Sequence, residues 1–192
     1  MDDILHVKRL ALLVLLASAA IVRADDAGNL LKNGDFSGGI APWQGDITPA
    51  TLTSGALVKL GADWSKVSQV YNATTGDYTL TVKYAVTSGS AFSTDPHMYG
   101  NVSNRLAIPG VGGFGSQIGQ WVILLYNPVS SSFWRLTPRH GSAAQIFTAR
   151  VHLKADTDNN DTSQNLLLAF PPGTGTVNLL SISLVPATGT AH

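Results

Sequence analysis

Two segments of this sequence alternate apolar and polar side chains residue by residue, and no other feature constrains the fold as strongly. In residues 77–87 the apolar set is Tyr78, Leu80, Val82, Tyr84 and Val86. Residues 145–154 repeat the pattern, with apolar side chains at every second position from 147 to 153. A period of two residues is that of a β-strand with one buried face and one solvated face. Both segments therefore predict half-buried strands.

Other segments predict more strands and no helices. Residues 121–126 and 165–170 are short, continuous apolar runs bounded by Gly, Pro or Asn, which is typical of central strands covered on both faces. Weaker strand candidates are residues 57–60, 67–71, 132–136 and 177–185. All 12 acidic residues are aspartate and 19 residues are glycine, so strong helix formers are scarce and turn formers are common. The sequence predicts an all-β sandwich or barrel.

Charge and cysteine content exclude several classes of function. Lys and Arg together number 12, as do Asp and Glu, so the formal net charge is zero. Nucleic acid is therefore not an expected partner, because binding to phosphates requires a basic surface. The chain has no cysteine, which excludes disulfide scaffolds, thiolate metal sites and cysteine nucleophiles.

Residues 1–24 predict a cleaved secretory signal peptide. Lys8 and Arg9 precede the apolar run 10–22, and Ala24 ends the segment, with Ala20 as the alternative cleavage position. The run is shorter than the roughly 20 residues of a membrane-spanning helix. We therefore expect a secreted or extracytoplasmic protein without a membrane anchor after cleavage. The expected β-sandwich domain covers residues 25–187, followed by a flexible tail at 188–192.

Residues 88–119 form the least regular part of the sequence. They include Pro96, Pro109 and seven glycines and show no strand period. A long irregular insertion in a compact domain is usually functional or mobile. This stretch is therefore a candidate binding loop.

Three segments resemble a known family. Residues 29–43 contain Asn29-Leu-Leu, Asn33-Gly-Asp-Phe36 and Gly39-Ile-Ala-Pro-Trp43, and they look like the family's opening strand. Residues 65–82 resemble its strand pair with a Gly-x-Tyr-x-Leu step, and 177–184 resemble its final strand. The resemblance is to carbohydrate-binding modules of the galactose-binding-like jelly-roll type, such as families 4, 9 and 22. It implies an antiparallel jelly-roll β-sandwich whose partner is a carbohydrate or polysaccharide.

The opening motif also has a physical explanation. Asn33-Gly34 suits a turn with positive φ, and the glycines at 38 and 39 let the chain change direction. We expect Phe36 and Trp43 to be core residues rather than ligand contacts.

Calcium is disfavoured although the resemblance raises it. Relatives commonly hold a structural Ca²⁺ with an acidic residue just after the motif's phenylalanine and another in the final strand. Here those positions are Ser37 and Leu180 or Ser181, which leaves Asp35 as the candidate ligand. Residues 156–161 have Asp-x-Asp-x-Asn spacing but lack the glycine and the bidentate glutamate of a calcium loop, and we expect a hairpin loop there. No cofactor is required.

Sugar recognition calls for aromatic rings beside polar side chains, because the apolar faces of sugars stack on rings while their hydroxyls form hydrogen bonds. The candidate ligand-binding residues are Trp64, Gln69, Tyr71, Tyr99, Asn101, Trp134, Arg135 and Arg139. Trp134 is the strongest of them because Ser-rich and Pro-containing segments flank it. An inward, structural Trp134 is the alternative.

The sequence favours binding over catalysis. A glycosidase needs two carboxyl groups about 5–9.5 Å apart, and most aspartates here occupy turns. A lyase could use Tyr126, Arg139 and His140. The leading hypothesis is a secreted, non-catalytic carbohydrate-binding module. The alternatives are a structural or adhesion β-sandwich without a sugar site and, less favoured, a polysaccharide lyase or glycoside hydrolase.

Overall fold

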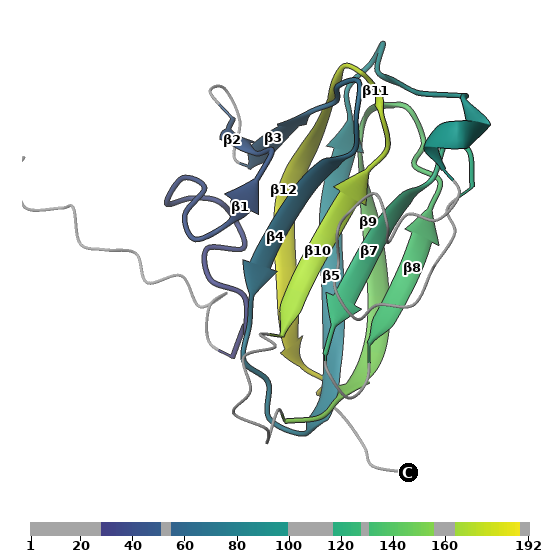
Figure 1. Ribbon diagram of the computed structural model, residues 1–192. Coiled ribbons are helices and arrows are strands. Elements are labelled where there is room, and N and C mark those ends of the chain that lie inside the picture. The colour runs from purple at the N-terminus through teal and green to yellow at the C-terminus, as the bar shows by residue number, and fades with distance from the viewer. Residues whose placement is uncertain (1–27, 51–54, 100–116, 128–130, 156–163, 189–192) are drawn as a thin grey trace, which may run out of the picture.

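Two antiparallel β-sheets lie face to face and enclose the core (Figure 1). The computed structural model describes residues 28–50, 55–99, 117–127, 131–155 and 164–188. Sheet A has the order β1 (Gln44–Gly45), β4 (Ser65–Val70), β10 (Asn165–Phe170), β7 (Trp121–Tyr126) and β8 (Ser132–Leu136). Sheet B has the order β2 (Thr48–Pro49), β3 (Ala56–Lys59), β12 (Thr176–Pro186), β5 (Gly76–Val86) and β9 (Gly141–Leu153). The predicted antiparallel jelly-roll β-sandwich is confirmed.

The two alternating segments form neighbouring strands of sheet B. Strands β5 and β9 pair with Tyr78 opposite Val151 and Leu80 opposite Ala149. Leu80 and Val82 are fully buried, whereas Lys83 on the other face is exposed. The alternation in the sequence therefore marks which side chains face sheet A, and the prediction is confirmed.

The two continuous apolar runs form the middle of sheet A, as predicted. Strand β10 lies between β4 and β7, and no residue of β7 from Trp121 to Leu125 is more than 2% exposed. The inward ring of Trp121 stacks on Phe170 at 4.7 Å and meets Tyr84 of sheet B edge-on at 5.0 Å. The outward residues of these strands belong to a second apolar cluster on the outer face of sheet A. Cover on both faces explains why these strands show no alternation.

The N-terminal segment differs from the opening strand that the resemblance implies. Residues 29–43 form successive turns, with only single backbone hydrogen bonds to β12, such as that from Leu30 N to Leu184 O at 2.9 Å. The Asn29 side chain gives the physical reason. Its Oδ1 accepts hydrogen bonds from the backbone amides of Leu31 and Leu184. A side-chain oxygen therefore takes the place of the backbone carbonyl groups that a paired strand would supply.

The opening motif does supply core residues. Phe36 and Trp43 are 5% and 4% exposed, and their rings lie 5.5 Å apart, which confirms their expected place in the core. Asn33 has a φ of 50°, as the predicted turn requires.

Both predicted terminal segments fall mostly outside the described residues. The predicted signal peptide at 1–24 lies wholly outside them, and of the 188–192 tail only Thr188 is described. Within the described ranges, no helix has the length and hydropathy to cross a membrane.

Candidate functional site

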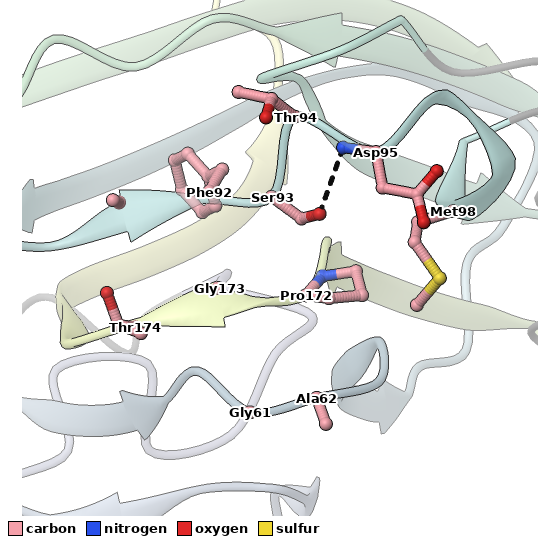
Figure 2. A pocket seen from close by; sticks show the side chains of 11 residues that line it. Gly61, Ala62, Phe92, Ser93, Thr94, Asp95, Met98, Pro172, Gly173 and Thr174 are labelled. Atoms are coloured by element: carbon pink, nitrogen blue, oxygen red, sulfur yellow. Dashed lines mark hydrogen bonds between the residues drawn. The ribbon is translucent and has the colours of Figure 1, made fainter.

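A groove of about 570 Å³ lies at the end of the sandwich where three connecting segments meet (Figure 2). The first segment joins β3 to β4, and the second contains β6 (Ala91–Phe92) and η2 (Pro96–Met98), a single 3-10 turn. The third leads from β10 through β11 (Gly173–Thr174) into β12. The groove is lined by Gly61, Ala62, Ala91, Phe92, Ser93, Thr94, Asp95, Met98, Pro172, Gly173 and Thr174.

Backbone hydrogen bonds join the three segments. Strand β6 pairs with β11, and Ser93 N donates to Pro172 O at 2.6 Å just beyond that pair. Gly173 N donates to Gly61 O at 2.8 Å, which ties the third segment to the first. Because the polar backbone groups are satisfied between segments, the groove is preformed.

Gly173 permits this close approach. A Cβ at this position would collide with the backbone oxygen of Ala91 on the paired strand. A glycine is therefore required where β11 crosses β6.

Two aromatic residues hold the η2 turn against sheet A. Trp64 Nε1 donates to the backbone oxygen of Met98 at 2.8 Å, and the Tyr99 hydroxyl donates to Ser93 O at 2.6 Å. The two rings pack edge to face at 6.0 Å and cluster with outward residues of β7 and β10, such as Val122. Trp64 and Tyr99 thus fix the groove wall that carries Asp95 and Met98.

Trp64 and Tyr99 were predicted as ligand contacts, and the structure places both inside. They are 5% and 2% exposed, so their ring faces pack against protein. They do not converge with Trp134, which lies on the other side of sheet A. Their role here is to position the groove rather than to line it.

Gln69 and Tyr71 are also buried, at 4% each. The Gln69 amide exchanges two hydrogen bonds with the backbone of Lys32, at 2.6 and 2.9 Å. The Tyr71 hydroxyl donates to Tyr126 O, and burial raises the pKa of this phenol well above its usual value. Both side chains fasten segments of the framework, and neither lines the groove.

The structure separates three predicted residues on and just after β8. Trp134 points inward and is partly buried, with its ring 5.4 Å from that of Phe147. The structure therefore agrees with the alternative of an inward, structural Trp134. Arg135 points outward, its guanidinium carbon 5.1 Å from the centre of the Phe133 ring. Arg139 is exposed in the turn to β9, where Gln145 bonds to its backbone. Asn101 lies outside the described residues.

Sequence reasoning missed Phe92, Met98 and Thr174 in the groove, and Phe133 on the outer face of sheet A. The first three lie in loops or two-residue strands, where no period shows which way a side chain points. Phe133 could have been found, because it alternates with Trp134 on a predicted strand and must face the opposite way.

Asp35 does not lie in a cation cage. Its Oδ1 accepts from the amide and hydroxyl of Ser37, at 3.0 and 2.8 Å. In the same loop the Asn33 amide donates to the carbonyls of Gly39 and Ala41, so a side chain cross-links oxygens that a cation could bridge. The described ranges contain no cluster of three metal-ligating His, Asp or Glu side chains. The oxygen atoms of this loop therefore do not fit a Ca²⁺ site. That the protein functions without Ca²⁺ stays a prediction.

The three residues of the lyase hypothesis do not meet. Tyr126 ends β7 beside Asn165, whereas Arg139 and His140 follow the opposite end of β8, where Leu136 pairs with Trp121. Five residues of strand separate these ends, about 17 Å. His140 instead lies beside the groove residue Phe92, with ring centres 5.8 Å apart.

Solved structures share this arrangement of strands. A family 61 carbohydrate-binding module in complex with β-1,4-galactotriose aligns with 83% of this chain and 99% of its own, with a TM-score of 0.53 and 12% identity. The chain has the fold of a carbohydrate-binding module. A second such module, from family 16, aligns with 82% of this chain and 99% of its own, with a TM-score of 0.50 and 13% identity. No protein-family model matches the chain, and no curated protein matches it in sequence.

Proposed function

We propose that this protein is a secreted, non-catalytic carbohydrate-binding module and that the loop-end groove is its binding site. The observation that carries the proposal is the groove itself, a preformed depression of about 570 Å³ on a carbohydrate-binding-module fold. Its volume lies within the range of small-molecule sites.

The groove lining offers both kinds of contact that a sugar needs. Phe92, Met98 and Pro172 supply apolar surface for the ring carbons. Asp95 and Thr174 supply oxygen atoms that can form hydrogen bonds with hydroxyl groups. Figure 2 shows these side chains around the groove, with Ser93 and Asp95 joined by a hydrogen bond.

The acidic groups support binding without cleavage. Among the lining residues that the structure describes, Asp95 is the only carboxylate. Glycoside hydrolysis commonly needs a pair of carboxyl groups, one acting as acid and the other as base or nucleophile. A lone carboxylate can bind a hydroxyl but does not provide that pair.

Affinity electrophoresis of the full chain in gels containing neutral polysaccharides tests the proposal. We expect retardation by at least one glycan, including β-1,4-galactan in the panel, and a loss of at least tenfold in affinity for Phe92→Ala. Binding by wild type that Phe92→Ala leaves unchanged would refute the groove as the site, and retardation by none of the glycans would refute carbohydrate binding.

Two control variants locate the binding surface. Ile146→Ala removes an exposed apolar side chain from the outer face of β9, and we expect unchanged binding. Phe133→Ala removes the 39%-exposed ring beside Arg135. A loss of binding in Phe133→Ala alone would move the site to the outer face of sheet A.

A further inference from the structure

Asn33 and Gly34 form the only Asn-Gly pair in the sequence. Such a pair is prone to deamidation, because glycine has no Cβ to hinder attack of its backbone nitrogen on the side-chain amide carbon. The bond from Gly34 N to Asn33 Cγ forms, the Cγ–Nδ2 bond breaks, and the amide proton of Gly34 leaves with Nδ2 as ammonia. Water then opens the cyclic imide at either carbonyl, which leaves aspartate or isoaspartate at position 33.

In the folded chain the amide of Asn33 is fully engaged in hydrogen bonds. Its Nδ2 donates to Gly39 O at 2.8 Å and to Ala41 O at 3.0 Å, and its Oδ1 accepts from Gly38 N at 3.0 Å. Both donor positions of the amide nitrogen are therefore used. Because Nδ2 is the leaving group, deamidation of the folded chain must give up these bonds.

The peptide group that joins the two residues is held on both sides. Gly34 is buried, and its backbone oxygen accepts from Ile182 N of β12 at 2.8 Å. A Cβ on Gly34 would overlap the backbone oxygen of Ile182, so the two backbones are in close contact. Trp43 Nε1 donates to Asn33 O at 3.1 Å. The attacking nitrogen of Gly34 is therefore fixed in position and shielded from the base that must remove its proton.

We propose that Asn33 is a latent deamidation site, which the native fold protects and which local opening of residues 33–41 exposes. Deamidation then makes the opening irreversible. A carboxylate at position 33 accepts hydrogen bonds but has no N–H to donate, so it cannot restore the bonds to Gly39 O and Ala41 O. Two buried or half-buried segments lose their cross-link each time the reaction occurs. This inference does not depend on carbohydrate binding.

Peptide mass spectrometry of the full chain measures the rate of deamidation at Asn33 at mildly alkaline pH, in buffer and in guanidinium chloride. Asn72, which is exposed and followed by alanine, is the internal reference for a slow site. Two variants are compared in buffer. Trp43→Phe keeps a ring beside Phe36 but removes the bond to Asn33 O. Ser37→Ala is the matched control, because it removes an exposed hydroxyl from the same loop.

The protection is measured by the ratio of the two rates. We expect Asn33 to deamidate at least about tenfold more slowly in the folded chain than in the unfolded chain, and Trp43→Phe to raise the folded-state rate about threefold to tenfold. Ser37→Ala should match wild type. Equal rates in the folded and unfolded wild-type chain, or no reaction at Asn33 in the unfolded chain, would overturn the proposal even if Trp43→Phe does not fold.

Asn33→Asp tests whether the product blocks reclosure. This variant supplies the carboxylate without the reaction, and its thermal unfolding is measured in excess chelator so that no cation bridges the carboxylate to the two carbonyl groups. We expect a lower melting temperature than that of wild type, because the cross-link is lost. A melting temperature equal to that of wild type would overturn the claim that deamidation makes the opening irreversible.

Discussion

The indole Nε1 of Trp64 donates a hydrogen bond to the backbone oxygen of Met98 over 2.8 Å, which links the start of β4 to the wall of the groove. Trp64 lies in the apolar cluster outside sheet A, and Met98 lines the groove. A buried residue that no ligand touches can therefore set the shape of the candidate binding surface.

Trp64→Phe keeps an aromatic ring but removes this bond. We expect the free energy of unfolding to fall by about 1 kcal/mol, measured by urea denaturation, and carbohydrate affinity to fall with it. Tyr78→Phe is the matched control. It removes the hydrogen bond from the Tyr78 hydroxyl to Thr74 O, near the N-terminal end of β5 and not at the groove. It should lower stability without changing affinity, and an equal loss of affinity in both variants would show that Trp64 has no specific link to the groove.

Gly173→Ala and Gly61→Ala compare two glycines of the same groove. A Cβ at Gly173 collides with Ala91 O, whereas a Cβ at Gly61 meets no atom within 4 Å. We expect Gly173→Ala to lower the free energy of unfolding by about 1–3 kcal/mol and to weaken binding, and Gly61→Ala to change stability by less than about 0.5 kcal/mol. Similar thermal unfolding of the two variants would contradict the close packing of β6 on β11.

Asn33→Gly separates the hydrogen bonds of Asn33 from its backbone conformation. Glycine keeps the positive φ but loses the bonds to Gly39 O, Ala41 O and Gly38 N. The expected loss is about 1–3 kcal/mol in chemical denaturation. Ser37→Ala, which removes an exposed hydroxyl from the same loop, should cost less than about 0.5 kcal/mol. Equal effects would mean that the Asn33 amide is not the cross-link of this loop.

Chelation should leave the fold unchanged. Because the Asn33 amide bridges two carbonyls and Asp35 Oδ1 bonds to Ser37, we expect the melting temperature to be the same in excess chelator and in excess Ca²⁺. A rise in the melting temperature with Ca²⁺ that Asp35→Asn abolishes would establish the calcium site and refute our interpretation of this loop.

Two tyrosines should resist ionisation until the protein unfolds. Burial raises the pKa of Tyr71 and of Tyr84 above the ordinary value near 10. Above that pH the unfolded chain loses these protons while the native state keeps them, so stability is complete below about pH 10 and falls as the pH rises further. Ultraviolet titration should show these phenolates only together with unfolding, and Tyr84→Phe should reduce the alkaline loss of stability. Their ionisation in the folded protein would contradict the burial.

The sequence predicted the long strands because side-chain alternation and apolar runs record burial directly. Tyr78 to Val86 and Trp121 to Tyr126 form strands at the predicted positions, and residues 132–136 coincide with β8. The groove could not be predicted in this way. Its wall depends on contacts between residues far apart in the chain, such as Trp64 with Met98 and Gly173 with Gly61, and no local pattern encodes such contacts. The aromatic residues selected as ligand contacts were good candidates by chemistry, but tertiary packing buried Trp64, Tyr71 and Tyr99.

Backbone amide chemical shifts, recorded while the full chain is titrated with neutral oligosaccharides, show whether sugars bind in the groove. We predict that saturable shifts gather at Gly61, Ser93, Asp95 and Gly173, on the three segments that line the groove. Shifts confined to the outer face of β8, around Phe133 and Arg135, would contradict the groove as the binding site. An unchanged spectrum with every sugar would contradict carbohydrate binding itself.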